Sequence, residues 1–200
     1  MKVLARYSVL AICGIFLLSC GTALKEIALK SQSERTDIFK EVQGGEPIAR
    51  EFVELTITSS IKTHLEGYYL LESKKSLHGK VGYPFVINID GQAATWKVDG
   101  QKESTPTYDE RGTRSPEGGE GMRYNLHKKI LLRAGSHRIF FALPEEDLFL
   151  QFELTLREGE SNILELRPVY KARVKQPHHF LHGVSRCEVL LNGNAIKPLK

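Results

Sequence analysis

Cysteine and tryptophan are scarce in this 200-residue chain, which has three Cys and one Trp. Cys13 and Cys20 fall in or directly after an apolar leader, so Cys187 is the only ordinary thiol expected in the mature chain. A single thiol makes no internal disulfide, which excludes a disulfide-stapled fold. Cys187 lies in an alternating apolar–polar run, and this favours a buried structural role over a reactive thiol.

Charge of one sign is also scarce. Without Lys2 and Arg6 of the leader, 26 basic residues face 24 acidic ones, a net charge of about +2. No run of like charges interrupts the sequence. This balance excludes the basic footprint of nucleic-acid binding and a polybasic membrane patch.

Recognisable catalytic motifs are missing. The sequence has no Gly-x-Ser-x-Gly elbow, Cys-x-x-Cys pair, phosphate-binding loop, EF-hand or His-Glu-x-x-His helix. We therefore expect a protein that is not an enzyme and carries no cofactor. A site assembled from residues far apart in the sequence would leave no such motif.

The first 19 residues have the features of a signal peptide. Lys2 and Arg6 give a positive start, and Val9 to Leu18 are almost wholly apolar. This apolar run is shorter than the roughly 20 residues that a membrane-spanning helix needs, but it suits a signal-peptide core.

The leader ends in Leu17–Leu18–Ser19–Cys20–Gly21, which resembles the lipobox of bacterial lipoproteins. The resemblance implies a diacylglycerol thioether on Cys20, cleavage before it, and a membrane-anchored protein of the cell envelope. Gly21, in place of an aspartate, favours the outer membrane facing the periplasm over the inner membrane. The alternatives are a plain secretory signal with an incidental cysteine or a short uncleaved anchor.

Residues 20–47 combine helix-like apolar spacing with the polar Ser31–Gln32–Ser33 interruption, and predict a lipidated, partly helical tether. From residue 48 to 200 the apolar period becomes two, as in strands with one buried face. The expected strand runs are Phe52–Thr58, Tyr68–Leu71, Phe85–Ile89, Ala94–Val98, Met122–Leu132, His137–Leu143, Leu148–Leu156, Ile163–Leu166 and Cys187–Leu191.

Glycine-bearing turns separate these runs, at Asp90–Gly91, Asp99–Gly100, Ala134–Gly135, Glu158–Gly159 and Asn192–Gly193. Asp-Gly and Asn-Gly pairs tolerate the positive φ of tight hairpins. Many short strands with regular turns predict an all-β fold, an antiparallel β-sandwich or barrel, of which we expect the sandwich.

Residues 102–121 interrupt the strand pattern with seven Gly, Pro and Asp residues and hardly any apolar side chain. Such a long loop in a compact domain is either a mobile insertion or a binding loop. The candidate partner-contacting side chains in it are Arg111, Arg114, Glu117 and Glu120.

Residues 85–168 resemble the PEGA-type repeat of bacterial surface and envelope proteins. The matching pieces are Ile89–Asp90–Gly91, Thr105–Pro106, Ala134–Gly135–Ser136–His137 and Glu158–Gly159–Glu160. The resemblance implies a small transthyretin-like or immunoglobulin-like β-sandwich. The Pro-Glu-Gly-Ala that names the family is absent, and Pro116–Glu117–Gly118 falls inside the long loop.

Four other places offer side chains with chemistry. His178, His179 and His182 could supply metal ligands, although Pro177 and Gly183 favour a solvated connecting loop. The remaining three positions are expected to be structural: His137 at a strand edge, Glu145–Glu146–Asp147 as a charged turn, and Trp96 as a core or sheet-face anchor.

The sequence thus predicts a non-catalytic envelope lipoprotein that contacts a protein or glycan partner. The first alternative is a metal-binding protein or metal-dependent enzyme that uses the histidines at 178–182. The second is a structural part of an envelope assembly that pairs through an exposed strand.

Overall fold

The computed structural model describes residues 20–43, 49–158, 160, 162–173, 176 and 178–199, with side chains from residue 23 onward. The predicted signal peptide, residues 1–19, and the Cys20 side chain lie outside this description. Among the described residues, no helix has the length and hydropathy needed to cross a bilayer.

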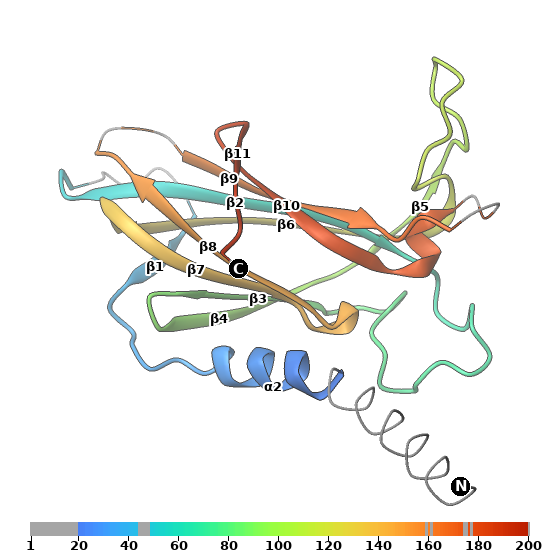
Figure 1. Cartoon of the computed structure of the whole chain (residues 1–200), viewed down its shortest axis with the longest axis horizontal. Helices are drawn as coiled ribbons and strands as arrows, with labels where there is room; N and C mark the ends of the chain where they lie inside the picture. The colour runs from blue at the N-terminus through green and yellow to red at the C-terminus, as the bar shows by residue number, and fades with distance from the viewer. Residues whose placement is uncertain are drawn as a thin grey trace, which may run out of the picture.

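Two β-sheets pack face to face, which confirms the predicted all-β sandwich (Figure 1). One sheet has seven strands in the order β1-β6-β2-β9-β10-β11, with β5 also paired to β6, and the other has four in the order β4-β3-β7-β8. The strands are β1 Phe39–Val42, β2 Phe52–Thr63, β3 Tyr83–Ile89, β4 Gln92–Val98, β5 Gln101–Thr105, β6 Gly119–Arg133, β7 Gly135–Leu143, β8 Leu148–Leu156, β9 Asn162–Tyr170, β10 Val184–Leu191 and β11 Asn194–Ile196. All pairs are antiparallel except β2 with β9.

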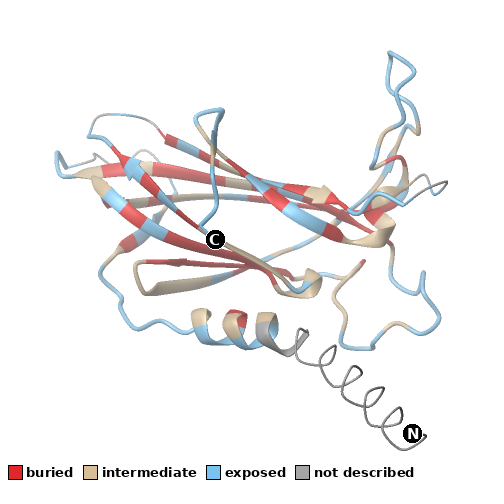
Figure 2. Cartoon of the chain, viewed as in Figure 1, coloured by how far each residue is buried: buried red, intermediate tan, exposed pale blue. Residues whose placement is uncertain are grey.

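The core lies between the two sheets, where the buried residues of facing strands meet (Figure 2). In β2, Val53, Leu55 and Ile57 are buried as the period of two predicts. In β8, Phe152 and Leu154 belong to the same core, and Phe149 points to the opposite face of the smaller sheet.

The N-terminal helix α2 (Cys20–Lys30) covers that opposite face of the smaller sheet (Figure 1). Ile27 is buried there against Val86, Phe140 and Ala142. Farther along, β1 pairs with residues 129–132 of β6. The segment expected as a tether up to residue 47 is therefore partly built into the sandwich, because its apolar groups have faces to bury against.

Two of the predicted tight hairpins are confirmed. Asp90–Gly91 joins β3 to β4 and Asn192–Gly193 joins β10 to β11, each with positive φ at both residues. By contrast, Asp99–Gly100 and Ala134–Gly135 connect strands of different sheets, so they are crossings and not hairpins. The Glu158–Gly159 turn falls partly outside the described residues.

Two segments differ from the sequence-based prediction. Tyr68–Leu71 is not a strand but part of an irregular segment, residues 64–82, between β2 and β3. The predicted loop 102–121 is shorter, since β5 takes its first residues and β6 begins at Gly119. Polar β5 forms because its backbone pairs with β6, a long-range effect that side-chain pattern alone does not carry.

Both edge strands of the smaller sheet are partly covered. The Ser33 hydroxyl bonds both the N–H and the carbonyl of Ala93 on β4. At the other edge, Leu199 N–H donates to the carbonyl of Gln151 on β8. These contacts reduce the free edge available for strand addition by a partner.

Candidate metal centre

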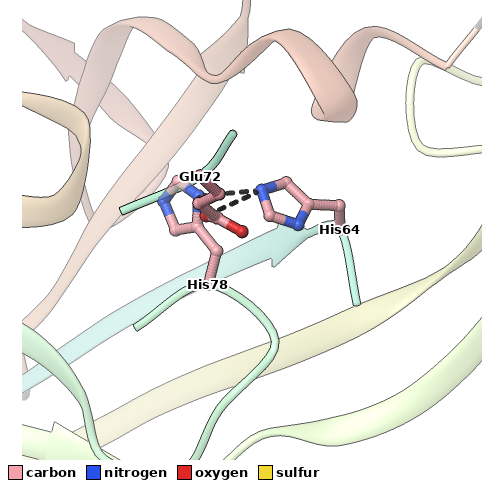
Figure 3. Close-up of side chains that lie close together, drawn as sticks. All are labelled: His64, Glu72 and His78. Atoms are coloured by element: carbon pink, nitrogen blue, oxygen red, sulfur yellow. Dashed lines mark hydrogen bonds and ion pairs between the residues drawn. The ribbon is translucent and has the colours of Figure 1, made fainter. Parts of the chain in front are cut away.

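The segment between β2 and β3 brings together His64, Glu72 and His78, here called the His64 cluster (Figure 3). His64 Nε2 lies 3.2 Å from His78 Nδ1 and 3.3 Å from Glu72 Oε1. His78 Nδ1 lies 3.7 Å from the same carboxylate oxygen. Three ligand atoms of types that bind transition metals thus face one another.

The local fold fixes the two histidines. His64 directly follows the last residue of β2, and His78 precedes Gly79 at the other end of the segment. Gly79 has a φ of 72°, and a Cβ there would lie 2.1 Å from the Glu66 backbone nitrogen. Only glycine permits this close approach, which draws the two ends of the segment together.

Aromatic contacts hold the middle of the segment. The ring of Tyr69 lies edge-on to His64 with centroids 4.9 Å apart, and its hydroxyl donates to the carbonyl of Leu181 at 2.8 Å. Glu72 comes three residues after this anchor. Its carboxylate lies next to the two histidines (Figure 3).

Each imidazole has its outer nitrogen close to a fixed oxygen atom, as a hydrogen bond at His64 and as an ion-pair contact at His78. His64 Nδ1 lies 2.9 Å from the Leu65 carbonyl, which only accepts hydrogen bonds, so this nitrogen carries the proton. His78 Nε2 lies 3.0 Å from Glu146 Oε1. The nitrogens left facing the cluster are His64 Nε2 and His78 Nδ1.

Three groups contact the Glu146 carboxylate: His78, the Val184 N–H and the Tyr83 hydroxyl. The Glu146 side chain is 4% exposed. Val184 N–H donates to Oε2 at 2.8 Å, and the Tyr83 hydroxyl donates to Oε1 at 3.4 Å. Gly183 allows the approach, since a Cβ there would lie 2.7 Å from Glu146 Oε2. The predicted charged turn at 145–147 includes a short 3-10 helix, Pro144–Glu146, and its Glu146 carboxylate points inward.

The His78–Glu146 pair shifts both titrations. Burial lowers the pKa of His78, but the contact with Glu146 and the charges of Glu146, Glu72 and Glu145 together outweigh burial and raise it above its ordinary value. Burial in turn raises the pKa of Glu146, but the contacts with His78, the Val184 N–H and the charge of Lys171 together outweigh burial and lower it. A histidine held by a buried carboxylate is the arrangement that orients metal ligands and increases their basicity.

Two neutral imidazoles with their outer nitrogens protonated would direct lone pairs at each other across 3.2 Å. That arrangement is repulsive unless a cation or a shared proton lies between them. The Glu72 carboxylate beside both nitrogens adds negative charge to the same point. The cluster is therefore built to hold one positive charge at this point, which a second proton on His78 or a bound metal ion would supply.

The spacing matches tetrahedral coordination. With zinc–ligand bonds of about 2.0–2.1 Å, neighbouring ligand atoms of a tetrahedron lie about 3.3–3.4 Å apart. The three measured separations are 3.2, 3.3 and 3.7 Å. A cavity of about 310 Å³ borders the cluster and leaves room for a fourth ligand such as water.

His178, His179 and His182, which were the alternative candidates for metal ligands, do not form a ligand group in the described part of the chain. His178 Nδ1 hydrogen-bonds to the Gly118 carbonyl. His179 begins the short 3-10 helix η2 (His179–His182), and His182 at its end lines the cavity beside the His64 cluster. The three histidines are close in sequence, but their ring nitrogens do not converge on one point.

The four loop residues proposed for partner contact have different surroundings. Glu117 is half-buried, is paired with Arg123 and accepts a hydrogen bond from the Tyr170 hydroxyl, so its carboxylate is engaged within the chain. Arg114 lies over the Tyr108 ring. Arg111 and Glu120 are exposed.

The other candidate positions are structural, as the sequence predicted. Trp96 is 5% exposed and donates from Nε1 to Glu41. His137 bonds Asp90 and the Arg133 carbonyl. Cys187 is buried, and burial raises its thiol pKa to about 12.

Sequence reasoning missed His64, Glu72 and His78 because no motif connects them. They are separated by seven and five residues along an irregular segment, and the supporting Glu146 comes from far along the chain. One feature of the sequence pointed to the site: two histidines, His64 and His78, lie on either side of Tyr68–Leu71, which was predicted as a strand from its apolar residues alone.

No family model matches the chain, and neither the curated proteins nor the solved structures contain a match. The resemblance to PEGA-type repeats and to lipoproteins therefore stays a prediction.

Proposed function

We propose that this chain is a lipid-anchored protein of the bacterial cell envelope that binds a transition-metal ion at the His64 cluster, with Zn²⁺ the best-fitting ion. The observation that carries the proposal is the convergence of His64 Nε2, His78 Nδ1 and Glu72 Oε1 on one point. The protein binds the ion and is not assigned a catalytic reaction.

Zinc fits for three reasons. Its ligands in proteins are imidazole nitrogen, thiolate and carboxylate oxygen, and the cluster offers two of the first and one of the last. The ligand spacing suits a small tetrahedral ion. The carboxylate of Glu146 behind His78 supplies the outer support that such sites have.

The anchoring part of the proposal is supported by the lipobox-like Leu17–Cys20 sequence and by its position. Cys20 begins α2, and α2 packs directly on the smaller sheet. A lipid on Cys20 would therefore hold the whole sandwich close to the bilayer.

The metal site is tested by titrating the purified, chelator-treated protein with Zn²⁺, Ni²⁺ or Cu²⁺ against a chromophoric competitor. We expect one ion per chain, with binding lost in His64→Ala and in His78→Ala. The matched control is His127→Ala, which removes an exposed imidazole on β6 and should leave binding unchanged. Full retention of binding in both cluster variants, or no binding by the parent protein, would refute the site.

The anchor is tested separately by mass spectrometry of the mature N-terminus and by incorporation of radiolabelled palmitate. We expect a lipid on Cys20 and loss of label in Cys20→Ser. An unmodified Cys20 thiol would refute anchoring and leave the metal site untouched.

A further inference from the structure

The most exposed apolar side chains of the described residues gather on the segment that carries Glu72. Leu70 is 99% and Leu71 is 100% exposed. Tyr68 and Val81, on the same segment, are also mostly exposed. A soluble protein gains nothing by keeping two adjacent leucines wholly in water, so such a patch marks a contact surface.

The two leucines are presented by an ordered turn. Glu72 N–H donates to the Tyr69 carbonyl at 3.2 Å, which closes a tight turn with Leu70 and Leu71 at its tip. Tyr69 is tied to Leu181, and Glu72 contacts His64. The tip thus projects from a fixed base, and its apolar atoms are available without rearrangement.

The N-terminal end of α2 lies at the same end of the molecule as the segment 64–82 (Figure 1). In Figure 1, the Cys20 end of α2 and the segment 64–82 both lie at the lower right, on the side away from the larger sheet. The loop at 106–118 projects from the same end but on the opposite side. A bilayer that holds Cys20 therefore lies on the side of residues 64–82.

The charges next to the tip suit a lipid surface. Lys74 and Lys75 follow closely in the sequence and are exposed. An apolar tip with neighbouring lysines is the composition of segments that enter the interfacial layer of anionic membranes.

We infer that the Leu70–Leu71 tip inserts into the interfacial layer of the anionic bilayer to which Cys20 is anchored. This inference rests on the proposed lipid anchor. It gives the protein a second point of attachment, which fixes the orientation of the sandwich and holds the His64 cluster next to the membrane surface.

The test uses the lipidated protein in vesicles of phosphatidylglycerol and phosphatidylethanolamine. Leu70→Cys is labelled with an environment-sensitive fluorophore, and Arg111→Cys, on the opposite loop, is the matched control. Cys187 does not compete for label, because it is buried and its pKa is raised to about 12. We expect quenching by nitroxide-bearing lipids to be at least about fivefold stronger at position 70 than at position 111. Equal, weak quenching at both positions would overturn the inference.

The double variant Leu70→Ser/Leu71→Ser removes the tip without removing any buried contact, so the fold is kept. With a label at Val81→Cys, quenching should fall to the level of the Arg111→Cys control. The matched variant Ile163→Ser, which removes an apolar side chain that is 52% exposed on β9, should leave quenching at Val81→Cys unchanged.

Mass spectrometry of the same sample separates this inference from the anchor. A lipidated Cys20 with position 70 in water refutes the tip and keeps the anchor. An unlipidated protein that still sediments with the vesicles, and loses this in Leu70→Ser/Leu71→Ser, refutes the anchor and upholds the tip. An unlipidated protein that does not sediment refutes both.

Discussion

Two polar clusters lie at the same end of β2, and they differ in how their charged and hydrogen-bonding groups are paired. The first surrounds Lys62 and comprises Lys62, Glu103, Glu117, Arg123 and Tyr170, here called the Lys62 network. The second is the His64 cluster, which begins just past the strand end. Both contain buried and partly buried polar groups, whose removal from water costs free energy unless they find partners.

The Lys62 network satisfies its own groups. Lys62 Nζ donates to Thr105 Oγ1 and to the carbonyls of Glu117 and Gly119, at 2.7–2.9 Å. Arg123 makes bidentate contacts with both Glu103 and Glu117. Two positive side chains face two negative ones, and the contacts lock the start of β6 to β5 and β2.

The His64 cluster is satisfied only on its outside. Leu65 and Glu146 engage the outer nitrogens of the two histidines, whereas the inner nitrogens face each other and Glu72. The positive charge that Arg123 supplies to Glu103 has to come here from a proton on His78 or from a bound metal ion. Burial alone therefore does not mark a functional site. What distinguishes the His64 cluster is a fixed set of ligand atoms that face one point.

The largest effect that separates the two clusters concerns stability. Lys62→Met should lower the free energy of unfolding by about 3–5 kcal/mol. The substitution leaves the oxygen atoms that accept from Lys62 Nζ without a donor, and it removes a positive charge next to Glu103 and Glu117. Urea denaturation of the metal-free protein measures this. Lys128→Met, which removes a half-buried lysine paired with Glu41 at the surface, is the control and should cost about 1 kcal/mol or less. Equal losses in the two variants would contradict a structural role for the network.

The next effect concerns metal affinity and distinguishes two adjacent glutamates. Glu146→Gln should weaken zinc binding by about 10–100-fold, because it removes the carboxylate that orients His78. Glu145→Gln keeps an acceptor for the N–H of Leu77 and should change affinity by less than about threefold. Competition titration with both variants measures the ratio, and similar affinities would show that Glu146 does not support the site.

The strands were predictable because their side chains alternate. An apolar side chain at every second position predicts one buried face, as at Leu55 and Ile57 of β2 and at Phe152 and Leu154 of β8. Trp96 and Cys187 followed the same rule. Tyr68–Leu71 broke it, since its apolar content belongs to an exposed turn and not to a face of a sheet.

The metal centre was not predictable in the same way. His64 is at a strand end, Glu72 is on a turn, and Glu146 reaches the cluster through the pairing of β3 with β7. Only the assembled sandwich makes these residues neighbours. The His178–His182 run suggested a metal site because its histidines are close in sequence, but the backbone around η2 directs His178 toward the Gly118 carbonyl.

A smaller effect is the opposite pH dependence of the two clusters. The Arg123 hydrogen bond lowers the pKa of Glu103 from 4.5 to about 2, so its contribution to stability is present above pH 4.5 and is lost as the pH falls toward 2. The pKa of His78 is raised, so in metal-free protein its contribution is present below pH 6.5 and is lost as the pH rises through the folded-state pKa.

Urea denaturation at a series of pH values measures both trends. Glu103→Gln should remove the loss of unfolding free energy at acidic pH and leave the change near neutral pH in place. His78→Gln should remove the change near neutral pH and leave the acidic loss in place. Curves of unchanged shape would show that neither group titrates as its contacts imply.

The smallest expected effect concerns His182, the one histidine of the 178–182 run that borders the same cavity as the His64 cluster. His182→Ala should change zinc affinity by less than about threefold, because the ligand atoms and their outer supports all lie elsewhere. The measurement is the same competition titration, with His78→Ala as the variant that abolishes binding. A loss of more than about tenfold in His182→Ala would make His182 the fourth ligand and the centre closed, since a structural zinc site has four protein ligands. A loss below threefold leaves the fourth position to water or to an exchangeable ligand, as three protein ligands beside an open cavity imply.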